Sequence, residues 1–513
     1  MNINRDNKEI YILLFFILIS FFLPLSLAPL FDLDEGAFSE ATREMLINHD
    51  YITTYLNGAL RFDKPILIYW LQLISVKTFG LNEFALRLPS AIAGAIWAWA
   101  IYFYTKELFN KKTAFWATLF MISSLQITII AKASIADSLL NMFIALSMFN
   151  LYLFFQKRED KYIYLTFLFI ALGTLTKGPV AIMIPFIVSL IFFILKGEFK
   201  LWLRMIFNPM GIVIFAIVAL PWYIAEYQAQ GKAFIDGFFF KHNLSRFSSA
   251  MEKHSGSIFY FVPVLIIGVM PFTYFILKAL KNFKIHLKSD ISLYLLIWFS
   301  FVFIFFSLSG TKLPHYVIYG YTPIFILGAL YIDNFNRKWL IYPLIIFLTL
   351  LLFLPDIATL LQNQIRDKLA VALIQNAYDT FDIWYRISLI FLILFAIYIY
   401  KKAKENKTFL ISIALIMTIM VNYIVIPTYG KLMQQPIKEA GLLAKEKRYK
   451  NIVMYRVNTP SFNVYYENLV KKSKKVKKGD IVFTKVTKLK DFKKYKTIYK
   501  KNGFALIQIE EIK

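Results

Sequence analysis

The sequence predicts an all-α polytopic membrane protein that ends in a small α/β domain. Of its 513 residues, 58% are hydrophobic and 18% are aromatic, whereas soluble domains have about 45–50% apolar residues. Apolar stretches long enough to cross a bilayer, or nearly so, recur along the first 430 residues. Beyond them the composition becomes strongly basic. We therefore divide the chain into a transmembrane domain, 1–430, and a basic domain, 431–513.

Thirteen apolar stretches are expected to cross the membrane. They lie near 10–30, 86–105, 113–131, 137–155, 162–176, 178–195, 209–227, 257–278, 290–308, 314–332, 338–355, 384–400 and 408–426. The first stretch is about 20 residues long, which exceeds the apolar core of a cleaved signal peptide, so we expect a retained helix. The shorter stretch 66–79 predicts an interfacial or re-entrant helix.

The distribution of lysine and arginine predicts the orientation. Alternate short connections carry dense basic residues, and such connections stay in the cytoplasm. The opposite connections are longer and more acidic or mixed, and they include 31–85, 228–256 and 356–383. With an odd number of spans, the N-terminus is then cytoplasmic and the C-terminus lies outside.

The basic domain holds 22 Lys/Arg against 7 Asp/Glu, a net charge of +15. Its segments NIVMY, SFNVYYEN, DIVFTKV and GFALIQIEE predict strand, helix, strand and strand. The charge could bind anionic lipid headgroups or the phosphates of a glycolipid, or it could simply form a solubilising surface. Cysteine is absent from the chain, which excludes disulfides, thiolate catalysis and cysteine-ligated metals.

The first outer loop, 31–85, concentrates acidic residues in a chain whose net charge is +26. It contains Asp32, Asp34, Glu35, Glu40, Glu44, Asp50, Asp63 and Glu83. Acids beside hydrocarbon are costly to place and are usually functional, so Asp34 and Glu35 are candidate catalytic residues. The structural alternative is a short amphipathic helix that Asp34 caps, with Glu35, Glu40, Arg43 and Glu44 at helical spacing.

Further candidates lie at other outer ends of apolar stretches. Asp137 opens the fourth stretch and is a third candidate catalytic carboxylate, although it could also be a charge that interacts with the helix dipole. Candidate phosphate-binding cations border apolar segments on the same side, although such side chains also snorkel to an interface. They are Lys64, Lys177, Arg246 and Lys312.

These residue types suit the transfer of a sugar from a lipid phosphate. A carboxylate can take a proton from an acceptor hydroxyl or orient the acceptor. Cations can stabilise the negative charge that grows on the departing phosphate. Because a phosphate is already a good leaving group, the acid and base pair of a glycosidase is not required.

Six ordered motifs carry a resemblance to a known superfamily. They are LDEGAFSEATREML, YLNGALRFDKPILIYW, ASIADSLL, TLTKGPVAI, FFFKHNLSRF followed by HSGSIFYFVPV, and GTKLPHYVIYGYTP. Together they resemble the bacterial GT-C glycosyltransferases of the protein O-mannosyltransferase superfamily, and in particular the aminoarabinose transferases that modify lipid A. The resemblance covers about residues 10–330.

The resemblance implies an enzyme of the bacterial inner membrane with a periplasmic C-terminal domain. It implies an undecaprenyl-phosphate-linked sugar as donor and a glycolipid such as lipid A or core oligosaccharide as acceptor; a protein acceptor is the alternative. Asp34 matches an essential acid of the family, Lys64 matches a lysine that contacts the donor phosphate, and Arg246 falls at the arginine of the family's histidine-bearing loop. Asp63 and His242 match a site in which the family can hold zinc, although Asp63 replaces the usual glutamate.

Other classes of protein fit the sequence less well. A transporter of lipid-linked sugars would show charges in mid-helix and internally repeated halves, and the sequence shows neither. An adhesion or sensor protein would have no use for the acidic first loop. We expect membrane lipids as partners and no nucleic acid.

Overall fold

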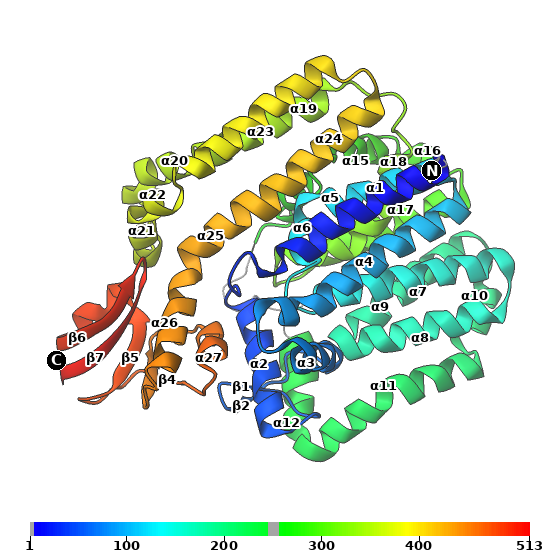
Figure 1. Cartoon of the computed structure of the whole chain (residues 1–513). Helices are drawn as coiled ribbons and strands as arrows, with labels where there is room; N and C mark the ends of the chain where they lie inside the picture. The colour runs from blue at the N-terminus through cyan, green and yellow to red at the C-terminus, as the bar shows by residue number, and fades with distance from the viewer. Residues whose placement is uncertain (1–4, 245–255, 513) are drawn as a thin grey trace.

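The computed structural model describes residues 5–244 and 256–512 of the chain. A bundle of long helices forms most of the molecule, and a small β-sheet lies beside one end of it (Figure 1). The short helices α2 and α3 lie at that same end of the bundle in the view. This end is where the candidate residues of the first outer loop gather.

All thirteen apolar stretches contain helix. Those of the first half are α1 (Arg5–Ile17), α4 (Glu83–Leu108), α5 (Lys111–Ser123), α6 (Leu125–Ile130), α7 (Asp137–Lys157), α8 (Asp160–Lys177), α9 (Val180–Leu195) and α11 (Pro209–Gln230). Those of the second half are α14 (Phe261–Gly268), α15 (Thr273–Lys281), α17 (Asp290–Leu308), η4 (Pro314–Gly320), α18 (Tyr321–Ala329), α19 (Lys338–Leu352), α23 (Ile383–Lys402) and α24 (Asn406–Ile419).

The chain is a multi-pass membrane protein. Across the described ranges, seven helices are long and apolar enough to span a bilayer by themselves. The number rises to eight if the pair Lys338–Leu352 and Leu354–Gln364, bent by 57°, forms one span. The remaining stretches are helices that are shorter or interrupted, so the count of thirteen crossings stays a prediction.

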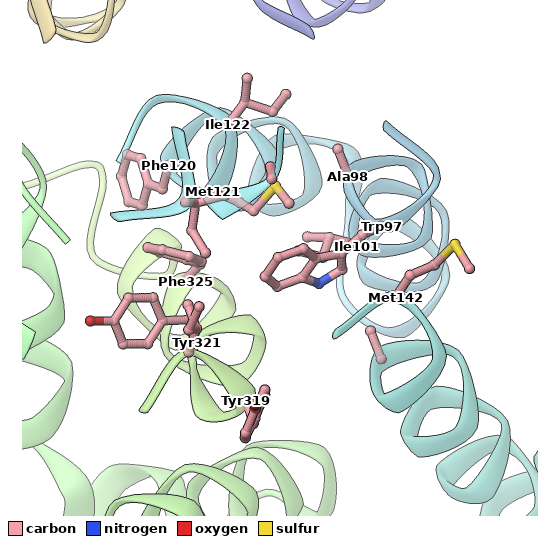
Figure 2. Close-up of a cluster of buried hydrophobic side chains, with 14 of the residues drawn as sticks. Trp97, Ala98, Ile101, Phe120, Met121, Ile122, Met142, Tyr319, Tyr321 and Phe325 are labelled. Carbon is pink, nitrogen blue, oxygen red and sulfur yellow. The ribbon is translucent and has the colours of Figure 1, made fainter. Parts of the chain in front are cut away.

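Aromatic side chains fill the interior of the bundle (Figure 2). Trp97 of α4 is fully buried, and its Nε1 donates to Thr322 Oγ1 at 2.8 Å. The ring of Phe120 in α5 stacks on Phe272, with 4.1 Å between ring centroids. A buried indole N–H requires such a partner. The first contact joins α4 to α18, and the second joins α5 to the residue that precedes α15.

At the far end of the bundle, ion pairs join the basic connections. Arg158 binds Glu198 at 2.7 Å, and Lys196 binds Asp290 at 2.8 Å. Exposed pairs of this kind stabilise a fold by less than about 1 kcal/mol each. They show that the connections after α7, α9 and α16 (Phe283–His286) lie at the same end, as the charge pattern predicts.

The first loop folds into α2 (Asp34–Asn48), a hairpin of β1 (Tyr55–Leu56) and β2 (Ala59–Leu60), and α3 (Leu67–Phe79). The helix predicted at 66–79 is confirmed. The structural alternative, in which Asp34 only caps an amphipathic helix, is not what the structure shows, because α2 begins at Asp34 and Leu33 holds the capping position without a side-chain hydrogen bond. The helix is not amphipathic either. Its charged residues Glu35, Glu40, Arg43 and Glu44 are all buried.

The C-terminal residues form a five-stranded sheet in the order β4-β3-β5-β7-β6. Its strands are β3 (Ile452–Tyr455), β4 (Lys471–Ser473), β5 (Ile481–Lys485), β6 (Phe492–Lys501) and β7 (Phe504–Ile512), and α26 (Gln435–Glu446) and α27 (Pro460–Tyr466) accompany it. The predicted strand, helix, strand and strand are therefore confirmed. Strands β4 and β6 were not predicted, because their lysines obscure the alternation of apolar and polar residues. Lysines of this kind are typical of edge strands.

Helix α27 attaches the sheet to the first loop through polar contacts. The Asp32 carboxylate accepts hydrogen bonds from the backbone N–H and the hydroxyl of Ser461. The Tyr465 hydroxyl donates to Glu83 at 3.0 Å and accepts from the backbone N–H of Leu30 at 2.8 Å. These contacts fix the start of α2 relative to the C-terminal domain.

Gly36 allows this close packing. A Cβ atom at that position would lie 1.9 Å from Asp32 Oδ1 and 2.9 Å from the Ser461 backbone nitrogen. Both distances are shorter than real Cβ contacts, so any larger residue would separate α2 from α27. The glycine within the DEGAF motif thus has a packing role.

Candidate active site

Asp137, Lys177 and Tyr319 form a buried triad. The Lys177 ammonium donates to Asp137 Oδ1 at 2.6 Å and to the Tyr319 hydroxyl at 2.7 Å. The Tyr319 hydroxyl donates to the same Asp137 oxygen at 2.9 Å. The start of α7, the end of α8 and η4 are brought together in this way. Asp137 lies in the first turn of α7, where its charge can interact with the helix dipole, and it also binds Lys177 and Tyr319.

The turn after Lys177 has no room for a side chain. Gly178 ends α8 with φ +79°, a left-handed conformation that favours glycine. A Cβ atom there would lie 2.6 Å from the Phe238 ring. The glycine of LTKGP therefore allows the turn after α8 to pack against Phe238.

His315 connects the triad with the first loop. Its ring lies within electrostatic range of Asp137, Lys177, Asp34 and Lys64. Asp34 is exposed at the start of α2, whereas Lys64 is half-buried and donates to the carbonyl of Asp63 at 2.9 Å. Four sequence-predicted residues thus lie within electrostatic range of one histidine at one end of the bundle.

Glu35 lies in a different, closed environment. Its carboxylate accepts from Arg87 Nε at 2.8 Å and Nη2 at 2.7 Å, and from the backbone N–H groups of Phe31 at 2.9 Å and Ser134 at 2.8 Å. Burial would raise the pKa of Glu35, but the Arg87 guanidinium and the hydrogen bonds offset it, so the pKa lies below its usual value. Four donors hold this carboxylate, an arrangement that suits a positioning residue.

Arg87 extends this closed network. It also donates to the carbonyls of Leu25, Ala28 and Pro29 at the end of the first span. The Glu35–Arg87 pair therefore joins the first span, α2, α4 and the segment before Asp137. Arg87 was missed from the sequence, although a charge inside the stretch 86–105 is the kind of signal that marks a functional or structural pair.

Lys312 lies three residues before His315 and interacts with backbone carbonyls. Its ammonium donates to the carbonyls of Ser307 at 2.7 Å and Ser309 at 2.9 Å, at the end of α17. Lysines commonly satisfy the last carbonyls of a helix in this way. A role of Lys312 in phosphate binding stays a prediction.

The remaining predicted residues are only partly described. Arg246 and the side chain of His242 lie outside the described residues, so their predicted roles cannot be placed. The Asp63 carboxylate lies 3.5 Å from Arg61 Nη2. In the part of the chain that the structure describes, no group of three or more histidine or carboxylate side chains is arranged to hold a metal ion. The zinc site at Asp63 and His242 stays a prediction.

One buried lysine was also missed. The ammonium of Lys132, in the segment AKASIAD, donates to the carbonyl of Thr128 and to the side-chain oxygen of Asn422. It is 6% exposed. The lysine thus ties the segment before Asp137 to the helix that follows α24.

The fold is that of a polytopic membrane protein, and comparison with known proteins identifies the fold as GT-C. Residues 63–224 match the family described as dolichyl-phosphate-mannose-protein mannosyltransferase. The crystal structure of ArnT from Cupriavidus metallidurans bound to undecaprenyl phosphate has the same fold. Its TM-score is 0.82 at 18% identity, with 98% of each chain covered.

Curated relatives bear the corresponding enzyme names. The chain is 31% identical over 344 residues to "Undecaprenyl phosphate-alpha-4-amino-4-deoxy-L-arabinose arabinosyl transferase 1" of Proteus mirabilis, which covers 66% of this chain and 62% of that protein. It is 30% identical over 338 residues to the similarly named transferase of Yersinia pestis strain Pestoides F, with 64% and 60% covered. The resemblance to the aminoarabinose transferases and their superfamily is confirmed.

Proposed function

We propose that this chain is an integral membrane glycosyltransferase. It transfers a sugar from undecaprenyl phosphate to a glycolipid acceptor such as lipid A or core oligosaccharide. The observation that carries the proposal is the buried Asp137–Lys177–Tyr319 triad, with His315 within electrostatic range of the triad and of Asp34 and Lys64. The names of the relatives support the donor and the reaction, and the match to ArnT supports the fold on which the cluster lies.

In the proposed reaction an acceptor oxygen attacks the anomeric carbon of the sugar. The bond between that carbon and the phosphate oxygen breaks, its electron pair stays on the phosphate, and undecaprenyl phosphate leaves. Asp34 takes the proton of an acceptor hydroxyl, or orients the acceptor if it is already an anionic phosphate. Lys64 and Arg246 hold the donor phosphate and stabilise the charge that develops on it.

The buried groups have supporting roles in this scheme. Lys177 and Tyr319 fix Asp137 and keep its charge at the cluster. Glu35, which the sequence placed among the catalytic candidates, is assigned to positioning, because its four donors belong to Arg87 and the backbone. Lys312 is assigned a structural role, because its ammonium binds carbonyls at the end of α17. A zinc ion at Asp63 and His242 is not needed for any of these steps.

The proposed location is the bacterial inner membrane. The N-terminus is cytoplasmic, the domain 431–513 is periplasmic, and the cluster faces the periplasm. The alternation of basic connections supports this orientation, because Lys and Arg are retained on the cytoplasmic side. In the structure the ion-paired basic connections lie at the other end from the Asp137–Lys177 pair, since α7 and α8 each run from one end to the other.

Mass spectrometry of glycolipids tests the proposal. Lipid A, core and polyprenyl lipids are compared among cells that lack the gene and cells complemented with wild type or Asp34→Asn. One sugar mass should disappear from a glycolipid and return with wild type only. Unchanged glycolipids in all strains, or full rescue by Asp34→Asn, would refute it. A sugar lost from a protein instead would make the acceptor a glycoprotein.

A further inference from the structure

A cavity lies between the C-terminal sheet and the start of α2. Its volume is 660 Å³, and it is lined by residues of the sheet, of α21 (Lys368–Gln375), of the helices around 433–437 and of the segment before α2. None of the residues assigned above to the reaction lines it. Two of its lining residues, Asp32 and Leu33, directly precede Asp34 in the chain.

The lining of this cavity includes both basic and apolar residues. Arg456, Lys472, Lys474 and Lys485 contribute four cations. The apolar residues include Leu33, Leu369, Met433, Ile437 and Phe504. A site of this composition favours an anionic amphiphile, whose phosphate meets the cations while its acyl portion contacts the apolar wall.

The acidic residues near the cavity offset only part of its positive charge. Asp32 is the single carboxylate among the lining residues, against four cations. The Asp32 carboxylate is already bound by Ser461. Burial raises its pKa to about 7, even though these hydrogen bonds act in the opposite direction. Asp491, which does not line the cavity, lies 3.4 Å from Arg456, whereas no ion pair joins Lys472, Lys474 or Lys485 to an acid among the described residues.

One polar group at the cavity lacks a partner. The side-chain oxygen of Gln434, which lines it, is buried without a hydrogen-bond partner among the described residues. Leaving a buried acceptor unpaired is costly. A sugar hydroxyl would satisfy it.

We infer that this cavity binds the phosphorylated sugar headgroup of the glycolipid acceptor and presents it to Asp34. The inference rests on the proposed function and names the place of its second substrate. Asp32 and Leu33 line the cavity, and Asp34 is the next residue, at the start of α2. A headgroup held by Lys472 and Lys474 would therefore lie beside the segment that leads into Asp34.

Direct binding tests the inference without turnover. Purified full-length protein in detergent is titrated with three probes: phosphorylated lipid A, the same lipid A after removal of its phosphates, and undecaprenyl phosphate. The variant is the triple substitution Arg456→Gln, Lys472→Gln and Lys474→Gln. The matched control is Lys477→Gln with Lys478→Gln, two exposed lysines of the same domain that do not line the cavity.

The triple variant should bind phosphorylated lipid A at least about tenfold more weakly than wild type, because charge-assisted contacts to the phosphate are lost. Its affinity for undecaprenyl phosphate should stay the same, and the control should match wild type. Unchanged binding of phosphorylated lipid A would overturn the inference. A selective loss of undecaprenyl phosphate binding would also overturn it, by making the cavity a donor site.

A failure of the proposed function gives a different result. If wild type binds phosphorylated lipid A through these cations but transfers no sugar to it, the reaction is wrong and the cavity assignment stands. If sugar is transferred and the triple variant keeps wild-type affinity, the reaction stands and the cavity assignment is wrong.

Discussion

Glu35 and Asp137 are two buried carboxylates, each paired with a cation at about the same distance, yet their surroundings differ. Glu35 uses both oxygens to accept from Arg87, and two backbone N–H groups complete its shell. Asp137 receives Lys177 and Tyr319 on the single oxygen Oδ1. Within the described residues no hydrogen bond reaches its other oxygen.

The neighbours of the two pairs differ as well. The Arg87 end of the first pair is closed by backbone carbonyls at the end of the first span. His315 lies within electrostatic range of the second pair, Asp137–Lys177, and also of Asp34 and Lys64. An ion pair is therefore informative about function only together with what surrounds it. A complete shell of donors indicates architecture, and an incomplete one beside further charges indicates chemistry.

The largest expected effect is on stability, at Glu35. All four atoms around its carboxylate are donors, so the amide of Glu35→Gln would place N–H groups against N–H groups. Breaking a buried ion pair on one side costs about 3–5 kcal/mol. Unfolding in detergent measures the loss. Glu107→Gln, which breaks the more exposed pair with Lys157, should cost less than about 1 kcal/mol. A Glu35→Gln protein of normal stability but without activity would make Glu35 catalytic.

Asp137→Asn should have the opposite profile. The amide oxygen can still accept from Lys177 and Tyr319, so the fold should tolerate the change. The lost charge should lower the turnover number by about 100-fold or more. Steady-state transfer assays measure it, with Asp160→Asn, at the first position of α8 at the far end, as control. A turnover number within threefold of wild type would place Asp137 outside the reaction.

Gly36→Ala tests the support of the cluster without changing a charge. The added methyl group would overlap the Asp32 carboxylate and separate it from Ser461. Overpacking of this kind costs about 1–3 kcal/mol. Melting temperature in detergent should fall, and Asp32→Ala in the same protein should restore part of the loss. Equal melting temperatures for Gly36→Ala and wild type would refute the tight junction of α2 and α27.

The smallest expected effect is a pH dependence at Asp32. Because its folded-state pKa of about 7 lies above the ordinary value of 3.8, the folded protein binds this proton more tightly than the unfolded chain. The stabilisation is complete below the ordinary value and is lost as the pH rises toward 7. The melting temperature of wild type relative to Asp32→Asn should therefore be higher at pH 5 than at pH 8. A difference that does not change with pH would contradict the shift.

The sequence predicted those features that depend on local pattern. Apolar runs located the helices of the bundle, and the short run at 66–79 located α3. Alternating apolar residues located β3, β5 and β7, whereas the lysines of β4 and β6 hid those strands. The order of the six motifs was sufficient to predict the resemblance to the superfamily. These signals are local because a helix or strand buries a face whose period can be read from neighbouring residues.

The partners of the charged residues could not be predicted in this way. Tyr319 lies 182 positions from Asp137, and Ser461 lies 429 positions from Asp32. No sequence spacing encodes such contacts, because helix packing determines them. For the same reason Glu35 and Asp34 were equivalent in the sequence. The structure separates them, since one side chain points into a shell of donors and the other is exposed at the cluster.

The proposed reaction is the transfer of a sugar from undecaprenyl phosphate by the cluster of Asp34, Lys64 and the Asp137–Lys177 pair. The most direct measurement is a single-turnover reaction of purified protein with an undecaprenyl-phosphate-linked sugar and phosphorylated lipid A. Wild type should release undecaprenyl phosphate in equal amount to the sugar that appears on the acceptor. Asp34→Asn should bind the undecaprenyl-phosphate-linked sugar normally but should release no undecaprenyl phosphate. Transfer at the wild-type rate by Asp34→Asn, or no transfer by a wild-type protein that binds both substrates, would contradict the account.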